Sequence, residues 1–534
     1  MLSFQRLAFL LATAISLGST AWATPLASSS QASLVSSRSE PDPSFAVSVE
    51  LGGVTYVNKG LVAFGLIPSD FVDSTGDTMG GFGSAIALQA FSKSSSGDRS
   101  DSESFTGTLV VQPDRGFNVD GTINYQARQH TLAFTLTPYY DPADLSFSDA
   151  QSTLQLTYLK TLLYTEREDK NTTGLDALGV RPAGSGETGG EGEDPVLPIA
   201  SEVDDRLSLD CEGLVSERDG TFWMSDEYGP YIYKFSSSGS LIKAIQPSAA
   251  ILPLDKKGNV NFTSAVDPKT GRAVNQGFEG LTTDSSHNTL YALLQSATIQ
   301  DGGDDDMTSR YTRLVAFDVS SSSTASSFTA ANVTSSRSET ATGTVTGEWV
   351  VPLPTSKKGK TRAASELHYV SEGVFFVLSR DGKGHGDDDD DASYKQADLI
   401  SLANATDIHG SKFDDPANPI ADDGKLDKSI VPATYVSFVD YLDDVQLARF
   451  GLHNGDPSDQ TLINAKWESL ALASCQDEAF PDDYFLFTVS DNDFITTNGT
   501  SLGQPYDAGL DNDNQFLVFR VTLPGAALGD LPAI

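Results

Sequence analysis

The sequence predicts an all-β fold with almost no helix. Apolar residues at helical spacing are nearly absent over the 534 residues. Short runs rich in Val, Phe, Tyr, Thr and Leu recur instead, separated by Gly, Asp, Asn or Pro. This combination is typical of many short antiparallel strands joined by turns. Because 39% of the residues are hydrophobic and 9% aromatic, the composition allows a substantial core and excludes a wholly disordered chain.

A repeated pattern orders these strands along the chain. Each of four copies has a Glu before one strand, a second strand that ends in polar residues, and a third strand with alternating apolar residues. The copies begin at DCEGL (210–214), GFEGL (277–281), SEL (365–367) and WESL (467–470), and a fifth copy, GGFGS (80–84), lacks the Glu. A unit of this kind is typical of a propeller blade, in which four strands stack radially around a central channel.

The spacing of the copies predicts a β-propeller of six blades, or seven. The copies start farther apart than the roughly 40–45 residues usual for a blade, which leaves room for one or two further blades. Insertions account for part of the spacing, at 184–194, 301–306, 320–342 and 387–391. The acidic runs lack the spacing of an EF-hand and are expected to be solvated loops. A pair of β-sandwiches with chance similarity is the alternative.

The N-terminal segment predicts secretion. Arg6 precedes a short apolar run, and a small-x-small cleavage site ends at Ala23, so residues 1–23 are expected to be a signal peptide. A membrane anchor is the alternative, but the run is short for a span, and no later segment is long enough. A disordered Ser- and Pro-rich leader is expected over 24–44, and a single propeller domain over 45–530. The protein is expected outside the cell or in the vacuolar lumen.

The net charge of −38 restricts the partners. Nucleic acid is excluded, because binding its phosphates needs clustered Lys and Arg. Docking on anionic lipid is disfavoured for the same reason. The expected partner is a small-molecule or ester substrate, and the chain is expected to be a monomer.

Five sequons and two cysteines bear on processing. The sequons predict a glycoprotein and lie at Asn171, Asn261, Asn332, Asn404 and Asn498. Two cysteines do not make a disulfide framework. Cys211 and Cys475 could pair in an oxidising compartment or remain two buried thiols.

The repeated polar residues predict a site at one mouth of the channel. The Glu residues that begin the innermost strands should converge there: Glu212, Glu279, Glu366 and Glu468. The clusters that end the second strands should lie on the same rim: Asp114, Arg115, Asp226, Glu227, Gln295, Arg380, Asp381, Asp491, Asn492 and Asp493. Converging carboxylates repel one another, so protons, a cation or the arginines must offset that repulsion.

Oxygen ligands without His or Cys suit a hard cation such as Ca²⁺. The candidate metal ligands are Glu212, Glu279, Glu366 and Asp491. The planar groups of Arg115 and Arg380 suit a carboxylate or phosphate. Sequence motifs for a nucleophilic serine, a zinc site and a phosphate-binding loop are absent. Any chemistry should therefore rest on carboxylates and arginines, with or without a metal ion.

In these residues the sequence resembles the phytase-like family, which is described as having esterase-like activity. The resemblance runs from about residue 75 to 525 and is carried by PDRG (113–116), DCEGL, FWMSDEYGPYIYKF (222–235), GFEGLTTD, SELHYV with VLSRDG, WESLAL and VSDNDF. It implies a β-propeller and a hydrolase of phosphate or carboxylic esters. Its characteristic positions fall on Asp114, Arg115, Glu212, Asp226, Glu227, Glu279, Gln295, Glu366, Arg380, Asp381, Glu468, Asp491 and Asn492. The first copy departs from the family, because GGFGSAIAL stands in place of GG-x-SGL.

Three functions are compatible with this pattern. The first is a secreted hydrolase of phosphoesters or other esters, with these catalytic candidates: Arg115, Glu212, Asp226, Glu227, Glu279, Arg380, Asp381 and Glu468. Its substrate-binding candidates are Arg115, Arg380, Gln295 and Asn492. The second is a propeller that binds an anionic ligand, a glycan or a protein without turnover. The third is purely structural, with the repeated carboxylates forming salt bridges between blades and turn caps.

Overall fold

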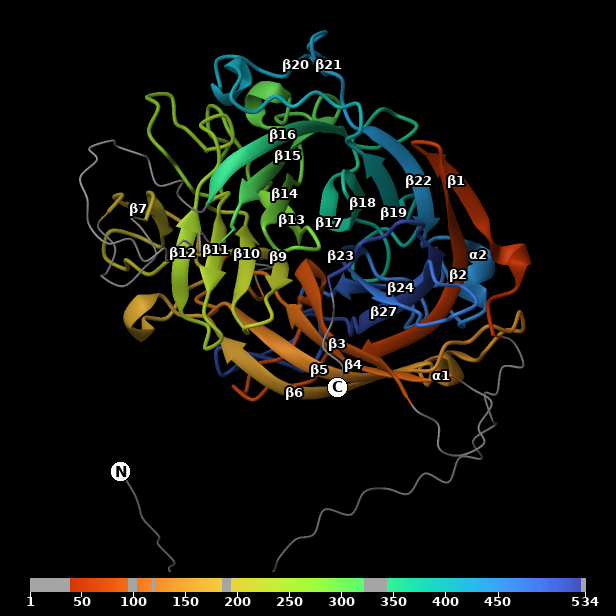
Figure 1. Ribbon diagram of the computed structural model, residues 1–534. Coiled ribbons are helices and arrows are strands. Elements are labelled where there is room, and N and C mark those ends of the chain that lie inside the picture. Colours follow the sequence, from red (N-terminus) through yellow and green to blue (C-terminus); the bar gives the residue numbers. More distant parts are fainter. Residues whose placement is uncertain (1–38, 95–102, 118–120, 185–193, 321–342, 530–534) are drawn as a thin grey trace, which may run out of the picture. The chain divides into compact units, whose positions relative to one another are not determined.

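The protein is described by a computed structural model over residues 39–94, 103–117, 121–184, 194–320 and 343–529. These residues belong to one compact unit, 36–534. Five antiparallel sheets are arranged around a common centre, which confirms the all-β propeller prediction (Figure 1). Within the described residues the α-helices are limited to α1 (Phe147–Ala150) and α2 (Asp444–Ala448). The predicted signal peptide and most of the predicted leader lie outside the described residues.

Each sheet is one blade, with its first strand nearest the centre. The first two blades contain β3 (Ala85–Lys93), β4 (Phe105–Gln112), β5 (Arg128–Leu136) and β6 (Leu154–Leu163), then β9 (Cys211–Ser216), β10 (Phe222–Asp226), β11 (Ile232–Phe235) and β12 (Leu241–Ile245). The next two contain β13 (Phe278–Thr283), β14 (Thr289–Leu294), β15 (Tyr311–Asp318) and β16 (Thr344–Pro352), then β17 (Ala364–Ser371), β18 (Val374–Arg380), β19 (Lys395–Ser401) and β22 (Thr434–Asp440). The last contains β23 (Lys466–Ser474), β24 (Asp483–Asp491), β27 (Asn514–Thr522), β2 (Val54–Ile67) and β1 (Val47–Leu51).

The prediction of six or seven blades is wrong, because the innermost strands form a closed cycle of five. Strand β3 contacts β9, followed by β13, β17 and β23, and β23 returns to β3. The long intervals between the copies hold outer strands and insertions. Two short hairpins lie in these intervals, β7 (Gly179–Arg181) with β8 (Leu197–Ile199) and β20 (Ala421–Asp422) with β21 (Lys425–Leu426). A third hairpin, β25 (Gly499–Ser501) with β26 (Gln504–Tyr506), lies between β24 and β27 of the last blade. Single 3₁₀ turns occur at Pro43–Phe45, Phe82–Ser84, Arg167–Asp169, Ile299–Asp301 and Lys412–Asp414.

The ring is closed by the N-terminal end of the described chain. Strand β2 pairs antiparallel with the C-terminal strand β27, so that the red and blue ends of the chain share one blade (Figure 1). Most residues of β2 are buried. This pairing hydrogen-bonds the outward edge of β27, which would otherwise be exposed.

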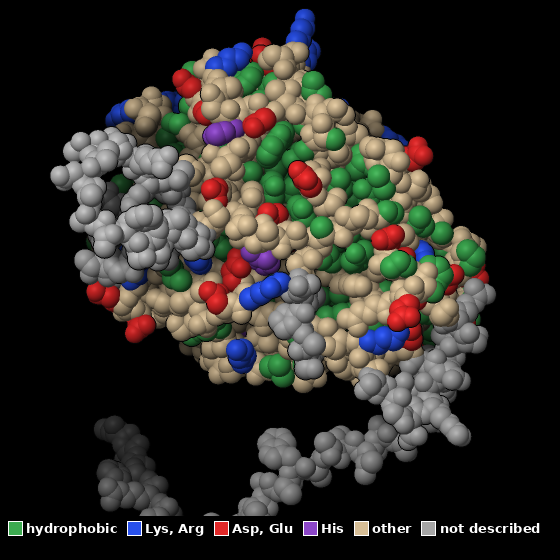
Figure 2. All heavy atoms as spheres, viewed as in Figure 1, with side chains coloured by type: hydrophobic (Ala, Val, Ile, Leu, Met, Phe, Trp, Pro, Cys, Tyr) green, Lys and Arg blue, Asp and Glu red, His purple; other side chains and the backbone are tan. Residues whose placement is uncertain are grey.

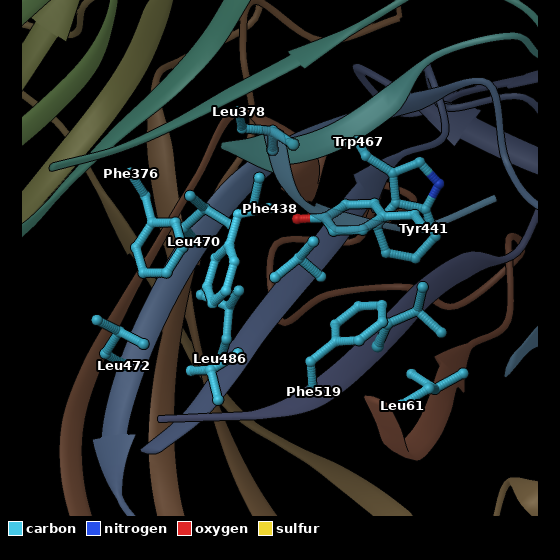
Figure 3. Packing of buried hydrophobic residues seen from close by; sticks show 14 of the residues in the cluster. Leu61, Phe376, Leu378, Phe438, Tyr441, Trp467, Leu470, Leu472, Leu486 and Phe519 are labelled. Atoms are coloured by element: carbon cyan, nitrogen blue, oxygen red, sulfur yellow. The ribbon is translucent and has the colours of Figure 1, made fainter. Parts of the chain in front are cut away.

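Apolar layers between the blades form the core. In the largest layer, the ring of Trp467 lies 5.7 Å from that of Tyr441, which stacks on Phe519 at 5.2 Å (Figure 3). Leu470 and Leu472 of the innermost strand β23 pack into the same layer. The core therefore reaches the innermost strands, whose other side chains define the channel.

Processing features are distributed as follows. Cys211 and Cys475 are both buried and unpaired, so the alternative of two separate thiols is the correct one. Three of the sequon asparagines are exposed, namely Asn171, Asn404 and Asn498, whereas Asn261 is half-buried and Asn332 lies outside the described residues. In the described chain, no helix is long and apolar enough to cross a membrane.

Candidate functional site

The repeated Glu residues lie at irregular positions of the innermost strands. The register of β9 against β10 shifts around Glu212, and that of β13 against β14 shifts around Glu279. Glu468 is likewise the extra residue where β23 pairs with β24. Such bulges re-aim side chains and interrupt the regular alternation of a strand. The local irregularity thus turns these three carboxyl groups toward a common region.

Glycine after the Glu allows the innermost strands to approach one another. A Cβ atom at Gly213 would lie 2.4 Å from the backbone nitrogen of Leu281, on the next blade. Any side chain at this position would therefore separate β9 from β13. In each Glu-Gly pair of the repeat, the Glu provides a carboxylate of the site. The Gly allows the close packing of strands that holds this carboxylate in place.

These carboxylates form part of a larger cluster, which we call the acidic mouth. Its members are Asp114, Asp210, Glu212, Glu227, Glu279, Glu468, Asp491 and Asp493, together with Arg115, Arg380 and Lys466. Oxygen atoms of Asp210, Glu212 and Glu227 lie within 4.8 Å of one another. About a third of the side chains of Lys466 (31%) and Asp493 (34%) is exposed, so the cluster reaches solvent on that side.

A pair of glutamates shares a proton within the acidic mouth. The carboxyl groups of Glu227 and Glu279 hydrogen-bond to each other, which requires that one of them is protonated. The side-chain amide of Gln295 donates to Glu279. Burial, followed by the charge of Glu227, raises the pKa of Glu279 well above its usual value. Oε1 of Glu227 is buried and has no hydrogen-bond partner among the described residues.

Three cations offset part of the negative charge. Nη1 of Arg115 lies 2.8 Å from Oδ2 of Asp210, and Arg380 forms an ion pair with Glu468. Nζ of Lys466 lies 2.5 Å from Oδ1 of Asp493 and 3.7 Å from Oδ2 of Asp491. Because eight carboxyl groups face three cations, the mouth cannot be neutral unless some of the carboxyl groups are protonated or a further cation binds.

Protonation provides part of this compensation. Burial raises the pKa of Asp210 to about 7, with Arg115 acting in the opposite direction and Glu227 adding to the rise. Burial and the charge of Asp210 likewise raise the pKa of Asp114 to about 7. Burial also raises the pKa of Glu468, but Arg380 and Lys466 outweigh this effect, so its pKa lies below the usual value. The mouth therefore contains both protonated and ionised carboxyl groups near neutral pH.

These shifts predict that the protein is more stable at pH 5 than at pH 8. The unfolded chain ionises Asp114 and Asp210 near pH 3.8, whereas the folded protein keeps their protons until about pH 7. The folded state then binds more protons between these values, so the free energy of unfolding falls as the pH rises. Thermal unfolding at pH 5, 6, 7 and 8 should show a midpoint that decreases with pH.

Repulsion among the many ionised carboxylates of the protein also lowers the free energy of unfolding as the pH rises. The contribution of Asp210 is therefore measured by comparing the pH dependence of the variants with that of wild type. Asp210→Asn should flatten the pH dependence, whereas Asp219→Asn, at an exposed carboxylate, should leave it unchanged. Equal pH dependence in wild type and Asp210→Asn would contradict the shift at Asp210.

Four predicted site residues bind groups other than the charged side chains of the acidic mouth, and of these Asp226 contacts the mouth through the backbone amide of Asp210. Oε1 of Glu366 accepts from the amides of Leu281 (3.3 Å) and Leu367 (2.8 Å). Each of the other three binds groups of the surrounding loops. Asp226 accepts from the amides of Asp210 and Gly229, Asp381 accepts from Ser393, and Asn492 accepts from Gly81 and Phe494. Their catalytic, substrate-binding or metal-binding roles stay predictions.

Sequence reasoning left three residues out of the candidate site. Asp210 and Lys466 lie in the acidic mouth, and Arg272 is fully buried behind it, donating to the carbonyl oxygens of Tyr228 and Phe262. Asp210 stands two residues before Glu212, and Lys466 two residues before Glu468. This shared offset from the repeated Glu is the signal that could have identified both. Nothing comparable marks Arg272.

The chain belongs to the phytase-like family. The family described as "Phytase-like: Esterase-like activity of phytase" matches residues 94–494. A protein from Arthroderma benhamiae, named as an uncharacterized secreted protein, is 38% identical over 504 residues, which cover 87% of this chain and 92% of that protein. The prediction of a secreted protein is confirmed by this relative.

Similarity to solved structures is weak. Regucalcin from Agrobacterium tumefaciens, a calcium-binding protein, is 10% identical, with 76% of this chain and 89% of that chain covered and a TM-score of 0.23. A catalytically inactive virginiamycin B lyase from Staphylococcus aureus is 9% identical, with 86% and 99% covered and a TM-score of 0.24. Scores of this size carry no information about the function of this chain.

Proposed function

We propose that the protein is a secreted hydrolase of ester bonds, either phosphoesters or carboxylic esters, and that the acidic mouth is its active site. The family is described by an esterase-like activity, which favours this class of reaction. The mouth combines ionised carboxylates, protonated carboxyl groups and arginines at one end of the channel. Hydrolysis of an ester needs these three kinds of group: a base, an acid and a cation near the developing anion.

The observation that carries the proposal is the buried, unpartnered Oε1 of Glu227. A buried acceptor without a donor is costly, and such groups are typical of functional sites. In the proposed reaction Glu227 accepts a proton from the attacking water. Arg115, whose guanidinium lies beside Asp210, stabilises the negative charge that develops on the ester oxygen. Asp210, with a pKa of about 7, can return a proton to the leaving group.

The same mouth offers ligands for a divalent cation. Asp210, Glu212 and Glu227 present only oxygen atoms, close enough together to surround one hard ion such as Ca²⁺. The unpartnered Oε1 of Glu227 supports this fit, because it lacks the hydrogen bond that a buried carboxylate otherwise needs. When bound there, a cation would supply a water molecule of lowered pKa and offset the carboxylate repulsion. Arg115 already pairs with Asp210, so Glu212 and Glu227 are the more available ligands.

The test is hydrolysis of a panel of phosphomonoesters, phosphodiesters and short-chain carboxylic esters by the purified mature protein. We expect product from at least one class, with a higher rate in calcium than in chelator. Glu212→Gln should lose the activity, whereas Asp304→Asn, a change of another acidic residue outside the mouth, should retain it. Saturable binding of an anionic compound without product would favour the non-catalytic binding function instead.

A further inference from the structure

A cavity lies in the channel, apart from the residues of the acidic mouth. Its volume is about 340 Å³, within the range of small-molecule sites. All five innermost strands contribute to its wall, which contains Ile86, Leu214, Leu281, His368 and Leu470. Glu212, Glu279 and Glu468 of the acidic mouth do not line it. We call this cavity the apolar pocket.

Glu366 closes the polar side of the apolar pocket. Glu366 is one of the lining residues, and its carboxyl group accepts hydrogen bonds from the backbone amides of Leu281, Leu367 and Leu470. Leu281 belongs to β13 and Leu470 to β23, so this side chain connects three innermost strands. Because the carboxyl group of Glu366 is hydrogen-bonded to the backbone, the leucine side chains provide the apolar surface that a ligand would contact.

His368 stands at a position of the sequence repeat where the other three Glu-containing copies have leucine. The second residue after each repeated Glu is Leu214, Leu281 or Leu470 in three blades, but His368 in the fourth. Within the described chain, no group hydrogen-bonds to its imidazole ring. A neutral imidazole offers one donor and one acceptor.

The residues of the wall favour a neutral ligand over a charged one. Leucine side chains cannot replace the hydration of an ion, so a charged ligand would be strongly disfavoured. The charged side chains on the wall are of both signs, Glu217 and Asp284 against Arg218 and His287. Nδ1 of His287 lies 3.0 Å from Oε2 of Glu217, so an anion would compete with Glu217 for this ring. Hydrophobic side chains also gather over the blades β13–β16 and β17–β22 on the face in Figure 2. A neutral, mostly apolar molecule fits best.

We propose that the apolar pocket binds a small neutral apolar molecule that carries a single hydrogen-bonding group, and that His368 binds this group. The site is separate from the acidic mouth and does not depend on the hydrolytic function. A ligand of this class buries its apolar part against the leucines of the other blades. The imidazole then satisfies the one polar group that burial would leave without water.

The test uses N-phenyl-1-naphthylamine, a neutral fluorescent probe with one N–H donor, and the full mature chain. We expect saturable binding at one site, with increased fluorescence. His368→Leu restores the residue of three other blades and should weaken binding about fivefold, the effect of one neutral hydrogen bond. Ser216→Trp, at the pocket end of β9, should weaken it at least about tenfold by filling the cavity.

Two controls separate this site from its alternatives. Ser371→Trp, at the end of β17 and outside the pocket wall, and Glu279→Gln, in the acidic mouth, should both leave the affinity within about twofold of wild type. Binding unaffected by His368→Leu would overturn the role of His368, and binding unaffected by Ser216→Trp, or absence of binding to wild type, would overturn the apolar pocket as the site. If Ser216→Trp does not fold, His368→Leu decides alone.

The chain itself offers another occupant, because Leu528 and Gly529 line the pocket and residues 530–534 follow them. A protein truncated after Gly529 distinguishes the two cases. Equal probe affinity in the full and truncated chains is expected. Binding only by the truncated chain would assign the pocket to residues 530–534 and contradict the proposal.

Discussion

Glu279→Gln is expected to lower the rate of ester hydrolysis by about 10²–10⁴-fold, the usual contribution of an acid–base group. Glu279 shares a proton with Glu227, so its replacement by an amide removes the partner that sets the protonation of the proposed base. The amide has nearly the same shape and carries no charge. Because the variant removes a buried carboxyl group of raised pKa, the free energy of unfolding should be equal or higher.

Steady-state rates and chemical denaturation of the same preparation check this prediction. Glu372→Gln, outside the mouth, is the matched control and should have wild-type values for both. A variant that is active but strongly destabilised would favour a purely structural role for the repeated carboxylates.

Arg115→Met is expected to reduce the free energy of unfolding by about 3–5 kcal/mol at pH 8, the effect of removing one partner of a buried ion pair. Only 16% of the Arg115 side chain and 2% of the Asp210 side chain is exposed, so solvent screens the pair little. Protonation of Asp210 removes its unpaired charge and so reduces the loss of unfolding free energy. The destabilisation should therefore be smaller at pH 5 than at pH 8.

Denaturant unfolding at the two pH values measures this difference. Arg115→Lys keeps the charge but loses the planar guanidinium, so it should recover much of the stability and little of the activity. Equal stability of wild type and Arg115→Met at pH 8 would contradict the ion pair as a structural element of the mouth.

The repeat predicted the blades themselves, including the copy without Glu, because each blade needs the same sequence of strand, turn and strand. It did not predict their number. The interval between GGFGS (80–84) and DCEGL (210–214) was long enough for an additional blade, but it holds the remaining strands of one blade and the β7–β8 hairpin. Interval length cannot distinguish an inserted loop from an undetected blade.

The site was predictable where the local geometry repeats. Glu212, Glu279 and Glu468 come together because an irregularity in each strand includes the Glu. In β17 the register shift precedes Glu366 and leaves that Glu within regular pairing with Leu378. Since alternate residues of a strand point to opposite sides, a displacement of one residue is enough to redirect its side chain. The sequence pattern SEL does not reveal this displacement.

The most direct test of the central claim is hydrolysis in water enriched in ¹⁸O, followed by mass spectrometry of the product. Wild-type protein should place one ¹⁸O atom in the released acid or phosphate, because water attacks the acyl carbon or the phosphorus. Glu212→Gln should give no labelled product above background. No product from any ester class with wild-type protein, or equal labelling by Glu212→Gln, would contradict the assignment of the acidic mouth as a hydrolytic site.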